Sequence, residues 1–212
     1  MSDPHDHQHG HRHPPQPDHD DTLTYPRKLE IAVRELLIEK GVISAGEVRK
    51  VVEDIESRSP EGGARVVARA WTDPEFKQDL LRDATAACEA MGFEMELYDV
   101  KLTVVENTPE VHNLVVCTLC SCYPRMLLGL PPAWYKSRAY RSRAVREPRA
   151  VLREFGLELP DKVAVRVHDS TADLRYLVLP MRPPRTGGLS ESQLAALVTR
   201  DSMIGTAVLR GS

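Results

Sequence analysis

Three of the four cysteines lie within six residues, as Cys117, Cys120 and Cys122. Thiolates are soft donors that select zinc, copper(I), or low-spin iron or cobalt. Three of them in so short a segment can reach one ion only where the backbone turns tightly around it. In such a turn the backbone amides of Ser121 and Cys122 also face the ion. The spacing therefore predicts a metal-binding loop at residues 117–122, which we call the claw loop.

Other uses of these cysteines stay open at this stage. A redox dithiol needs only C-x-x-C, which Cys117 and Cys120 supply, but Cys122 then has no part. A structural zinc site, as in a non-enzymatic binding module, needs four side-chain ligands, and only His112 is near enough in sequence to be the fourth. The cysteines could also be small buried hydrophobes, although Pro124 indicates a loop rather than a core helix.

The claw loop, in which Thr118 follows the first cysteine, resembles the metal motif of the nitrile hydratase α-subunit family. It resembles the cobalt-type form, where threonine takes the place that serine has in the iron type. Other segments resemble the family in the same order, at residues 130–136, 145–149, 175–180 and 201–205. The resemblance extends over residues 27–209, and it implies a layered architecture of helices and sheet.

For the site, the resemblance implies a cobalt(III) ion, with iron as the less expected metal. Cys117 would be an unmodified thiolate, Cys120 a sulfinic acid and Cys122 a sulfenic acid. The amide nitrogens of Ser121 and Cys122 would complete five donors and leave a sixth position open for water or substrate. The ion would polarise a nitrile or a bound water, so that the nitrile is hydrated to the amide. A β-type partner subunit would supply arginines to the oxidised sulfurs.

Two departures from the family pattern concern the substrate. Arg125 stands where ordinary nitrile hydratases carry tryptophan, and it resembles instead the γ-subunit of thiocyanate hydrolase, whose substrate is an anion. An arginine would also suit a polar nitrile, such as the nucleoside handled by toyocamycin nitrile hydratase. Tyr98 stands where many members have a pocket glutamine. We favour nitrile hydration, because the long insertion that thiocyanate hydrolase carries is absent between Phe93 and Thr103.

Asp169 and Arg175 are further candidates for the site. Both resemble family residues that brace the metal loop, as groups that orient metal ligands commonly do. The alternative is an ordinary ion pair at the ends of two strands, which contributes little when it is exposed. His168, beside them, is expected to be structural.

The chain is expected to divide into three parts. Residues 1–24 read as a disordered tail, since six of the eight histidines alternate there with polar residues and prolines. That tail could capture cobalt or nickel, or be a solvated segment or cloning remnant without function. Residues 25–92 are expected to form a helical N-terminal arm, and residues 93–212 an α+β metal-binding catalytic domain.

Capping and periodicity locate the helices of the arm. Pro26 opens a first helix that Gly41 ends, and Ser44 with Glu47 forms a capping box for a second. Both are short and apolar on one face, so a partner subunit is expected to cover them. After a break at residues 60–63, two more helices are expected, at residues 64–71 and 76–91, the latter opened by a capping box at residues 72–75.

The catalytic domain alternates strands and helices. Strands are expected at residues 102–105 and 114–116, at residues 163–167, where valines alternate with other residues, and at residues 176–179. A helix over residues 137–155 is expected to be interrupted at Pro148, and Ser190 with Gln193 caps a final short helix. The claw loop therefore follows the end of a strand, where a rigid sheet can position it.

The composition gives no support to several classes of protein. The 212 residues carry a net charge of −3, which gives no case for nucleic acid or membrane binding. Five arginines form a cluster in the sequence: Arg138, Arg141, Arg143, Arg146 and Arg149. Because Glu147 and Glu154 interleave with them, we expect a solvated helix with ion pairs at an interface rather than a nucleic-acid site. Without an apolar run or signal segment, the expected compartment is the cytoplasm, where thiols stay reduced until metal binds.

Overall fold

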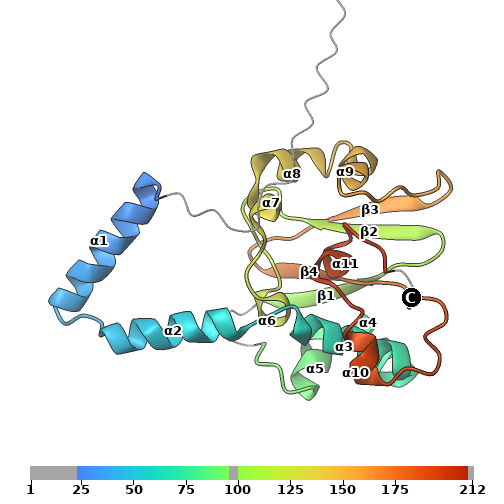
Figure 1. The fold of residues 1–212 in the computed structure, drawn as a ribbon, viewed down its shortest axis with the longest axis horizontal. Helices are drawn as coiled ribbons and strands as arrows, with labels where there is room; N and C mark the ends of the chain where they lie inside the picture. The colour runs from blue at the N-terminus through green and yellow to red at the C-terminus, as the bar shows by residue number, and fades with distance from the viewer. Residues whose placement is uncertain (1–22, 96–99, 210–212) are drawn as a thin grey trace, which may run out of the picture.

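The computed structural model describes residues 23–95 and 100–209, in which helices and strands combine in one α+β body with two helices extending from it (Figure 1). The predicted fold class is confirmed. Most of the expected histidine-rich tail (residues 1–22) and Tyr98 lie outside the described residues. Within the described part, no helix is both long enough and apolar enough to cross a membrane.

Within residues 23–95 and 100–209, four strands form two parallel pairs, close to the positions predicted from the sequence. Strand β1 (Lys101–Glu106) pairs with β4 (Leu174–Leu179), and β2 (Val111–Val116) pairs with β3 (Ala164–Asp169). In the second pair the last residue of β2 aligns with the last residue of β3. The carboxyl ends of both strands therefore meet at the start of the claw loop.

Helices cover the two sheets on opposite sides, which gives an α-β-β-α order of layers (Figure 1). Helices α8 (Arg138–Arg143) and α9 (Pro148–Glu154) lie beside the β2–β3 pair. The opposite side carries α3 (Glu61–Thr72), α4 (Pro74–Arg82) and α5 (Ala84–Ala90), of which α4 and α5 contact β1. Parallel strands need coverage on both faces, and these layers supply it.

A short helix near the C-terminus joins the layers. Helix α11 (Arg200–Ile204) contacts β2, β4 and α3, and its residues Met203 and Ile204 are almost fully buried. The helix ends at Gly205, whose φ of +93° lies in the left-handed region that favours glycine. A Cβ at this position would lie 2.0 Å from the carbonyl oxygen of Asn113, so the backbones of α11 and β2 touch here.

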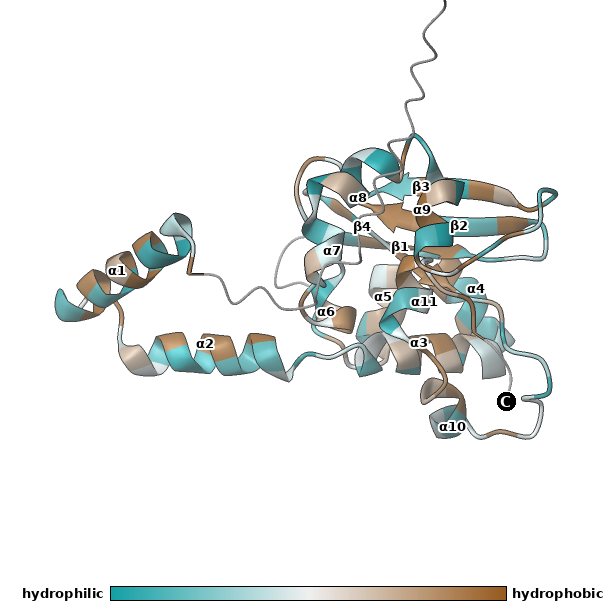
Figure 2. Cartoon of the chain, turned by 45° about the horizontal axis from the view of Figure 1, so that its top comes forward, coloured by the Kyte–Doolittle hydropathy of each residue, from teal (hydrophilic) through white to brown (hydrophobic). Residues whose placement is uncertain are grey.

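The first two helices form an arm that contributes no residue to the buried core of the described chain. Neither α1 (Tyr25–Glu39) nor α2 (Ala45–Ser57) contains a buried residue, and Figure 2 shows apolar residues along both. By contrast, α3 contributes six buried residues to the core. The division of the chain at residue 92 stays a prediction, but this packing favours a boundary near residues 58–60.

Several helix boundaries differ from those predicted. Helix α3 begins at Glu61 rather than Ala64, because Gly62 and Gly63 pack closely on Leu127, Leu128 and Met203 in its first turn. The single helix predicted over residues 76–91 is broken at Asp83, whose side chain accepts a hydrogen bond from the amide of Ala86 and so caps α5.

Other predicted signals proved partly correct. Asp73 alone caps α4, because Thr72 is the last residue of α3. The helix predicted over residues 137–155 is interrupted from residue 144 and restarts at Pro148, the first residue of α9. Two short helices, α6 (Arg125–Leu128) and α7 (Ala133–Lys136), were not predicted. The helix capped by Ser190 is α10 (Glu191–Ala195), which was expected to be the last helix, but α11 follows it. Single turns of helix carry too little periodicity to be recognised.

Candidate metal centre

The claw loop connects the end of β2 to α6 and turns its three thiols toward one another. Cys117 is fully buried, Cys122 is 8% exposed and Cys120 is open to solvent. The Sγ atom of Cys120 lies 3.5 Å from that of Cys117 and 3.2 Å from that of Cys122. All three Sγ atoms lie within 4.8 Å of one another. The loop thus brings together the three predicted ligands that act through side chains.

These separations test which metal geometry the thiols fit. Two thiolates about 2.3 Å from one ion lie about 3.3 Å apart at a right angle and about 3.8 Å apart at the tetrahedral angle. The observed 3.2 Å between Cys120 and Cys122 matches the right-angle value, which belongs to octahedral coordination, whereas the 3.5 Å between Cys117 and Cys120 lies between the two values. The closest pair of thiols therefore has the spacing that a six-coordinate ion requires.

The electrostatics of the loop also call for a cation. The hydrogen bond with Cys122 lowers the pKa of the Cys120 thiol, and the amides of Ser121 and Cys122 act in the same direction. Burial, followed by the hydrogen bond with Cys120, raises the pKa of the Cys122 thiol to about 12. Since neighbouring thiolates repel, the thiols of Cys120 and Cys122 ionise together only when a positive ion binds beside them.

Side chains from other elements hold the claw loop from both sides. Asp169, at the end of β3, accepts hydrogen bonds from the amide (2.9 Å) and hydroxyl (2.6 Å) of Thr118. The guanidinium of Arg141 donates to the carbonyl of Thr118 at 3.3 Å. Tyr135, fully buried, donates its hydroxyl to the carbonyl of Cys122 at 2.8 Å. Asp169 was predicted from the sequence to brace the loop, whereas Arg141 and Tyr135 were not, since nothing local in the sequence relates them to the loop.

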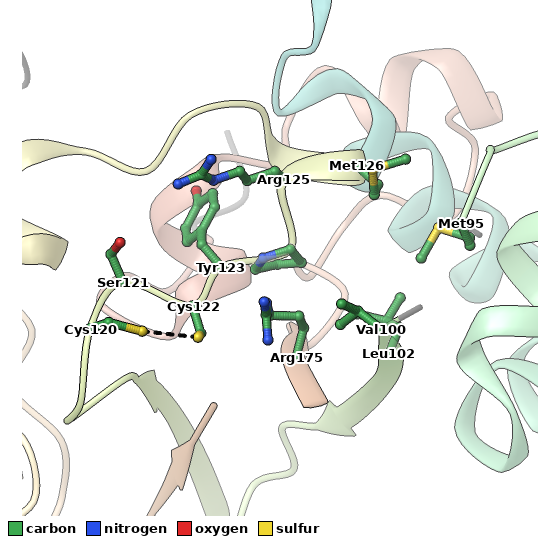
Figure 3. A pocket seen from close by; sticks show the side chains of 11 residues that line it. Met95, Val100, Leu102, Cys120, Ser121, Cys122, Tyr123, Arg125, Met126 and Arg175 are labelled. Carbon is green, nitrogen blue, oxygen red and sulfur yellow. Dashed lines mark hydrogen bonds between the residues drawn. The ribbon is translucent and has the colours of Figure 1, made fainter. Parts of the chain in front are cut away.

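A cavity of about 280 Å³ opens beside the sulfurs. Figure 3 shows Cys120, Ser121 and Cys122 at one end of it and apolar side chains at the other, the latter being Met95, Val100, Leu102 and Met126. Arg125 and Arg175 lie between the two ends. The cavity can therefore hold a small molecule with one end at the sulfurs and an organic group along the apolar wall.

The two arginines of the cavity differ in their surroundings. Arg175 donates to the backbone carbonyls of Thr171 and, at 3.0 Å, Ala172, in the turn that joins β3 to β4. Its charge acts to lower the pKa of Cys122. Arg125, at the start of α6, is exposed, and no ion pair is found for it among the described residues. The predicted alternative of an ion pair between Asp169 and Arg175 is wrong, because Asp169 binds Thr118 and Arg175 binds the turn.

The side chain of His112 forms its hydrogen bonds away from the claw loop. Its Nε2 atom lies 2.7 Å from the carbonyl oxygen of Gly205, and its Nδ1 atom lies 3.4 Å from the side-chain amide of Asn107. Within the described ranges, the cysteines form the single group of potential metal ligands, so the zinc alternative lacks a fourth side chain there. His168 bonds to Asn113 at 2.8 Å, as a structural residue would.

The redox alternative also lacks support in this geometry. A reactive C-x-x-C pair normally gains its low thiol pKa at the start of a helix. Here Cys117 and Cys120 lie in a loop, all four cysteines are free, and the nearest helix begins at Arg125.

The contact between Asp169 and Thr118 leads to a prediction about metal retention. Asp169→Asn places an amide donor against at least one of the two Thr118 donors, so the claw loop should lose its fixed conformation. We expect roughly 10-fold to 100-fold weaker metal retention, as is usual for residues that orient metal ligands. Metal content after timed chelator treatment measures this. Asp161→Asn, an exposed change elsewhere, is the control, and equal retention in both variants would contradict the bracing role.

A claw of three cysteines at the end of a strand pair, in an α-β-β-α body, defines a metalloprotein with a cavity open to its thiol donors. Residues 24–207 match the family model described as nitrile hydratase, alpha chain. The chain belongs to this family, and the prediction of an enzyme of the nitrile hydratase class is confirmed.

Named relatives include both enzymes considered above. The low-molecular weight cobalt-containing nitrile hydratase subunit alpha of Rhodococcus rhodochrous is 54% identical over 178 residues, covering 84% of this chain and 86% of that one. The thiocyanate hydrolase subunit gamma of Thiobacillus thioparus is 47% identical over 190 residues, covering 85% and 78%.

Solved structures agree with the fold over almost the whole chain. A double mutant of the Fe-type nitrile hydratase from Comamonas testosteroni Ni1 matches with a TM-score of 0.84 and 42% identity, covering 91% of this chain and 93% of that one. A recombinant thiocyanate hydrolase comprising partially modified cobalt centres matches with a TM-score of 0.81 and 43% identity, covering 90% and 95%.

Proposed function

We propose that this chain is the metal-binding subunit of a cobalt-type nitrile hydratase, which hydrates a nitrile to the amide at a cobalt(III) centre. The observation that carries the proposal is the convergence of three thiol sulfurs within 4.8 Å of one another beside an open cavity. Relatives named as cobalt-containing support cobalt, whereas an Fe-type structure is also similar.

The residues of the site have separate tasks in this proposal. When bound, the metal supplies Lewis acidity toward the nitrile nitrogen. Cys117, Cys120 and Cys122 hold it through sulfur, and the amide nitrogens of Ser121 and Cys122 complete the donor set. Cys120 as a sulfinic acid and Cys122 as a sulfenic acid would carry negative charge, which Arg175 lies close enough to offset. Tyr135 fixes the backbone at Cys122 by donating its hydroxyl to the carbonyl of that residue.

A partner subunit completes the site in this proposal. Relatives of this family are named as subunits, and α-type subunits of nitrile hydratases act in complexes with other subunits. Cys120 is open to solvent, so a β-type partner can reach the oxidised sulfurs with arginines of its own. We also propose the cytoplasm as the compartment, because the thiols must stay reduced until metal binds.

The cavity favours a nitrile that carries a polar or anionic group, of which a nucleoside nitrile is one kind. Its apolar end suits a ring, while the exposed guanidinium of Arg125 adds a charge between that end and the sulfurs. Without an acid partner among the described residues, Arg125 is available to a substrate acceptor.

Replacing Arg125 by glutamine tests this specificity. We expect kcat/KM for 4-cyanobenzoate to fall at least about tenfold while kcat/KM for benzonitrile changes little, because a charge-assisted hydrogen bond contributes about 1.5 to 3 kcal/mol. Lys162→Gln, which removes a charge elsewhere, is the control. An equal fall for both nitriles would mean that Arg125 does not discriminate substrates by charge.

Thiocyanate hydrolysis is the second candidate, because Arg125 also suits an anion and a thiocyanate hydrolase subunit is 47% identical. The products separate the two. Nitrile hydration yields an amide, whereas thiocyanate hydrolysis yields carbonyl sulfide and ammonia.

Metal content tests the proposed function most directly. The complex is purified from cells supplied with cobalt, iron and zinc together and analysed by mass spectrometry. We expect cobalt near one ion per chain, together with amide formation from nitriles. Stoichiometric zinc without turnover would overturn the proposal and return the claw loop to a structural role.

A further inference from the structure

A second cavity, of about 410 Å³, adjoins the claw loop at Thr118 and shares no lining residue with the cavity beside the sulfurs. Three arginines, on α8 and the turn after it, line it together with Val145 and Ser142; they are Arg138, Arg141 and Arg146. We call these three arginines and Val145 the arginine face. Arg138 and Arg146 are exposed, and Arg141 is partly buried.

The charges of the arginine face are not balanced within the described chain. The neighbouring acids Glu147 and Glu154 both pair with Arg143, each at 2.6 Å. In the described ranges, none of the three arginines of the face forms an ion pair, and the buried Nε of Arg141 has no hydrogen-bond partner. Like charges grouped on a short helix destabilise it, so an external anion would stabilise this surface.

The arginine face is also partly apolar, which bears on the kind of partner. Val145 within it is 46% exposed, and Leu119, next to Thr118 in the claw loop, is 82% exposed. Arginine combined with exposed apolar side chains is typical of protein interfaces. A nucleic-acid site would instead need an extended basic surface, whereas this chain has a net charge of −3 and two glutamates beside the face.

We infer that the arginine face receives an acidic segment of the β-type partner subunit, with carboxylates opposite the arginines and an apolar side chain against Val145. This inference rests on the proposed function, which requires such a partner. The segment would lie against Arg141, which donates to the carbonyl of Thr118, so assembly and the conformation of the claw loop are connected through one side chain.

Charge reversal at the two exposed arginines tests the inference. The double variant Arg138→Glu and Arg146→Glu leaves Arg141 in place, because Arg141 also holds the claw loop. Each variant is co-produced with the β-type subunit, and the apparent Kd of the complex is measured by dilution at low and high salt. We expect at least about tenfold weaker assembly, and a smaller salt dependence than in the unmodified complex.

Two further variants make the result specific. Arg153→Glu with Lys162→Glu changes the net charge equally at exposed positions away from the claw loop, and its Kd should stay within about twofold. Arg138→Gln with Arg146→Gln should weaken assembly in the same direction but less, which excludes misfolding caused by the introduced glutamates.

The remaining outcomes contradict the inference in distinguishable ways. If the unmodified chain assembles and turns over nitriles but charge reversal leaves its Kd unchanged, the inference fails and the proposed function stands. If the unmodified chain forms no complex with a β-type subunit, both fail. If instead nucleic acid co-purifies and is lost on charge reversal with assembly intact, the face binds nucleic acid.

Discussion

Cys122→Ser is expected to abolish nitrile hydration by the assembled enzyme, with a loss of roughly a thousandfold or more. A serine hydroxyl at neutral pH is not ionised as a bound thiolate is, and it cannot be oxidised to a sulfenic acid. The claw loop would also lose one of the three sulfurs that lie within 4.8 Å of one another. Turnover and cobalt content, measured on the same preparation, show whether activity and metal are lost together.

Ser121→Ala is the matched control for this change. In the proposed donor set Ser121 contributes its backbone amide, which the alanine variant keeps. We expect this variant to retain cobalt and most of its activity. If Cys122→Ser turned over nitriles at the unmodified rate, the assignment of the claw loop as the reaction centre would be wrong.

Gly205→Ala is expected to have the largest effect on stability. The added Cβ would lie 2.0 Å from the carbonyl oxygen of Asn113 and 2.9 Å from its carbon, both atoms of the β2 backbone. Neither atom can move without distorting the strand that leads into the claw loop. A left-handed φ of +93° adds strain for any residue with a side chain. We expect a loss of unfolding free energy on the order of 4 kcal/mol or more, which is a large part of the stability of a typical domain.

Gly41→Ala separates the two causes. Gly41 also has a left-handed φ, of +67°, but a Cβ there meets no atom within 4 Å. This variant should cost only about 1 kcal/mol, from backbone strain alone. Chemical denaturation of both variants measures the difference. Similar losses at the two positions would show that the contact between α11 and β2 has little energetic importance.

The convergence of the three cysteines could be predicted from the sequence because their spacing is local. Cys117, Cys120 and Cys122 are so near along the chain that a tight turn alone brings their sulfurs together. The strands were equally accessible, since β-branched residues mark three of them and a run of aliphatic and aromatic residues marks β4. Helix starts with side-chain caps, such as Ser44 before α2 and Ser190 before α10, were correct for the same reason.

Features that depend on distant contacts were not predicted. The break at Asp83, the start of α3 at Glu61 and the short helix α11 are decided by how these segments pack against the sheets. His112 is near the claw loop in sequence, yet the approach of Gly205 draws it into a separate hydrogen-bond network. Secondary-structure propensity cannot predict such packing, because it depends only on the local sequence and not on the segments that pack against it.

The amino-acid sequence by itself thus determined the cysteine cluster, the strands and the family, because these depend on neighbouring residues or on residue identity. Only the tertiary structure decided what surrounds the donors. Arg175 and Cys122 line the same cavity although they are 53 residues apart in the sequence. Asp169 and Thr118 are hydrogen-bonded although they are 51 residues apart. Such contacts exist only after parallel strands bring the ends of distant segments together, and the chain must close long loops to form them.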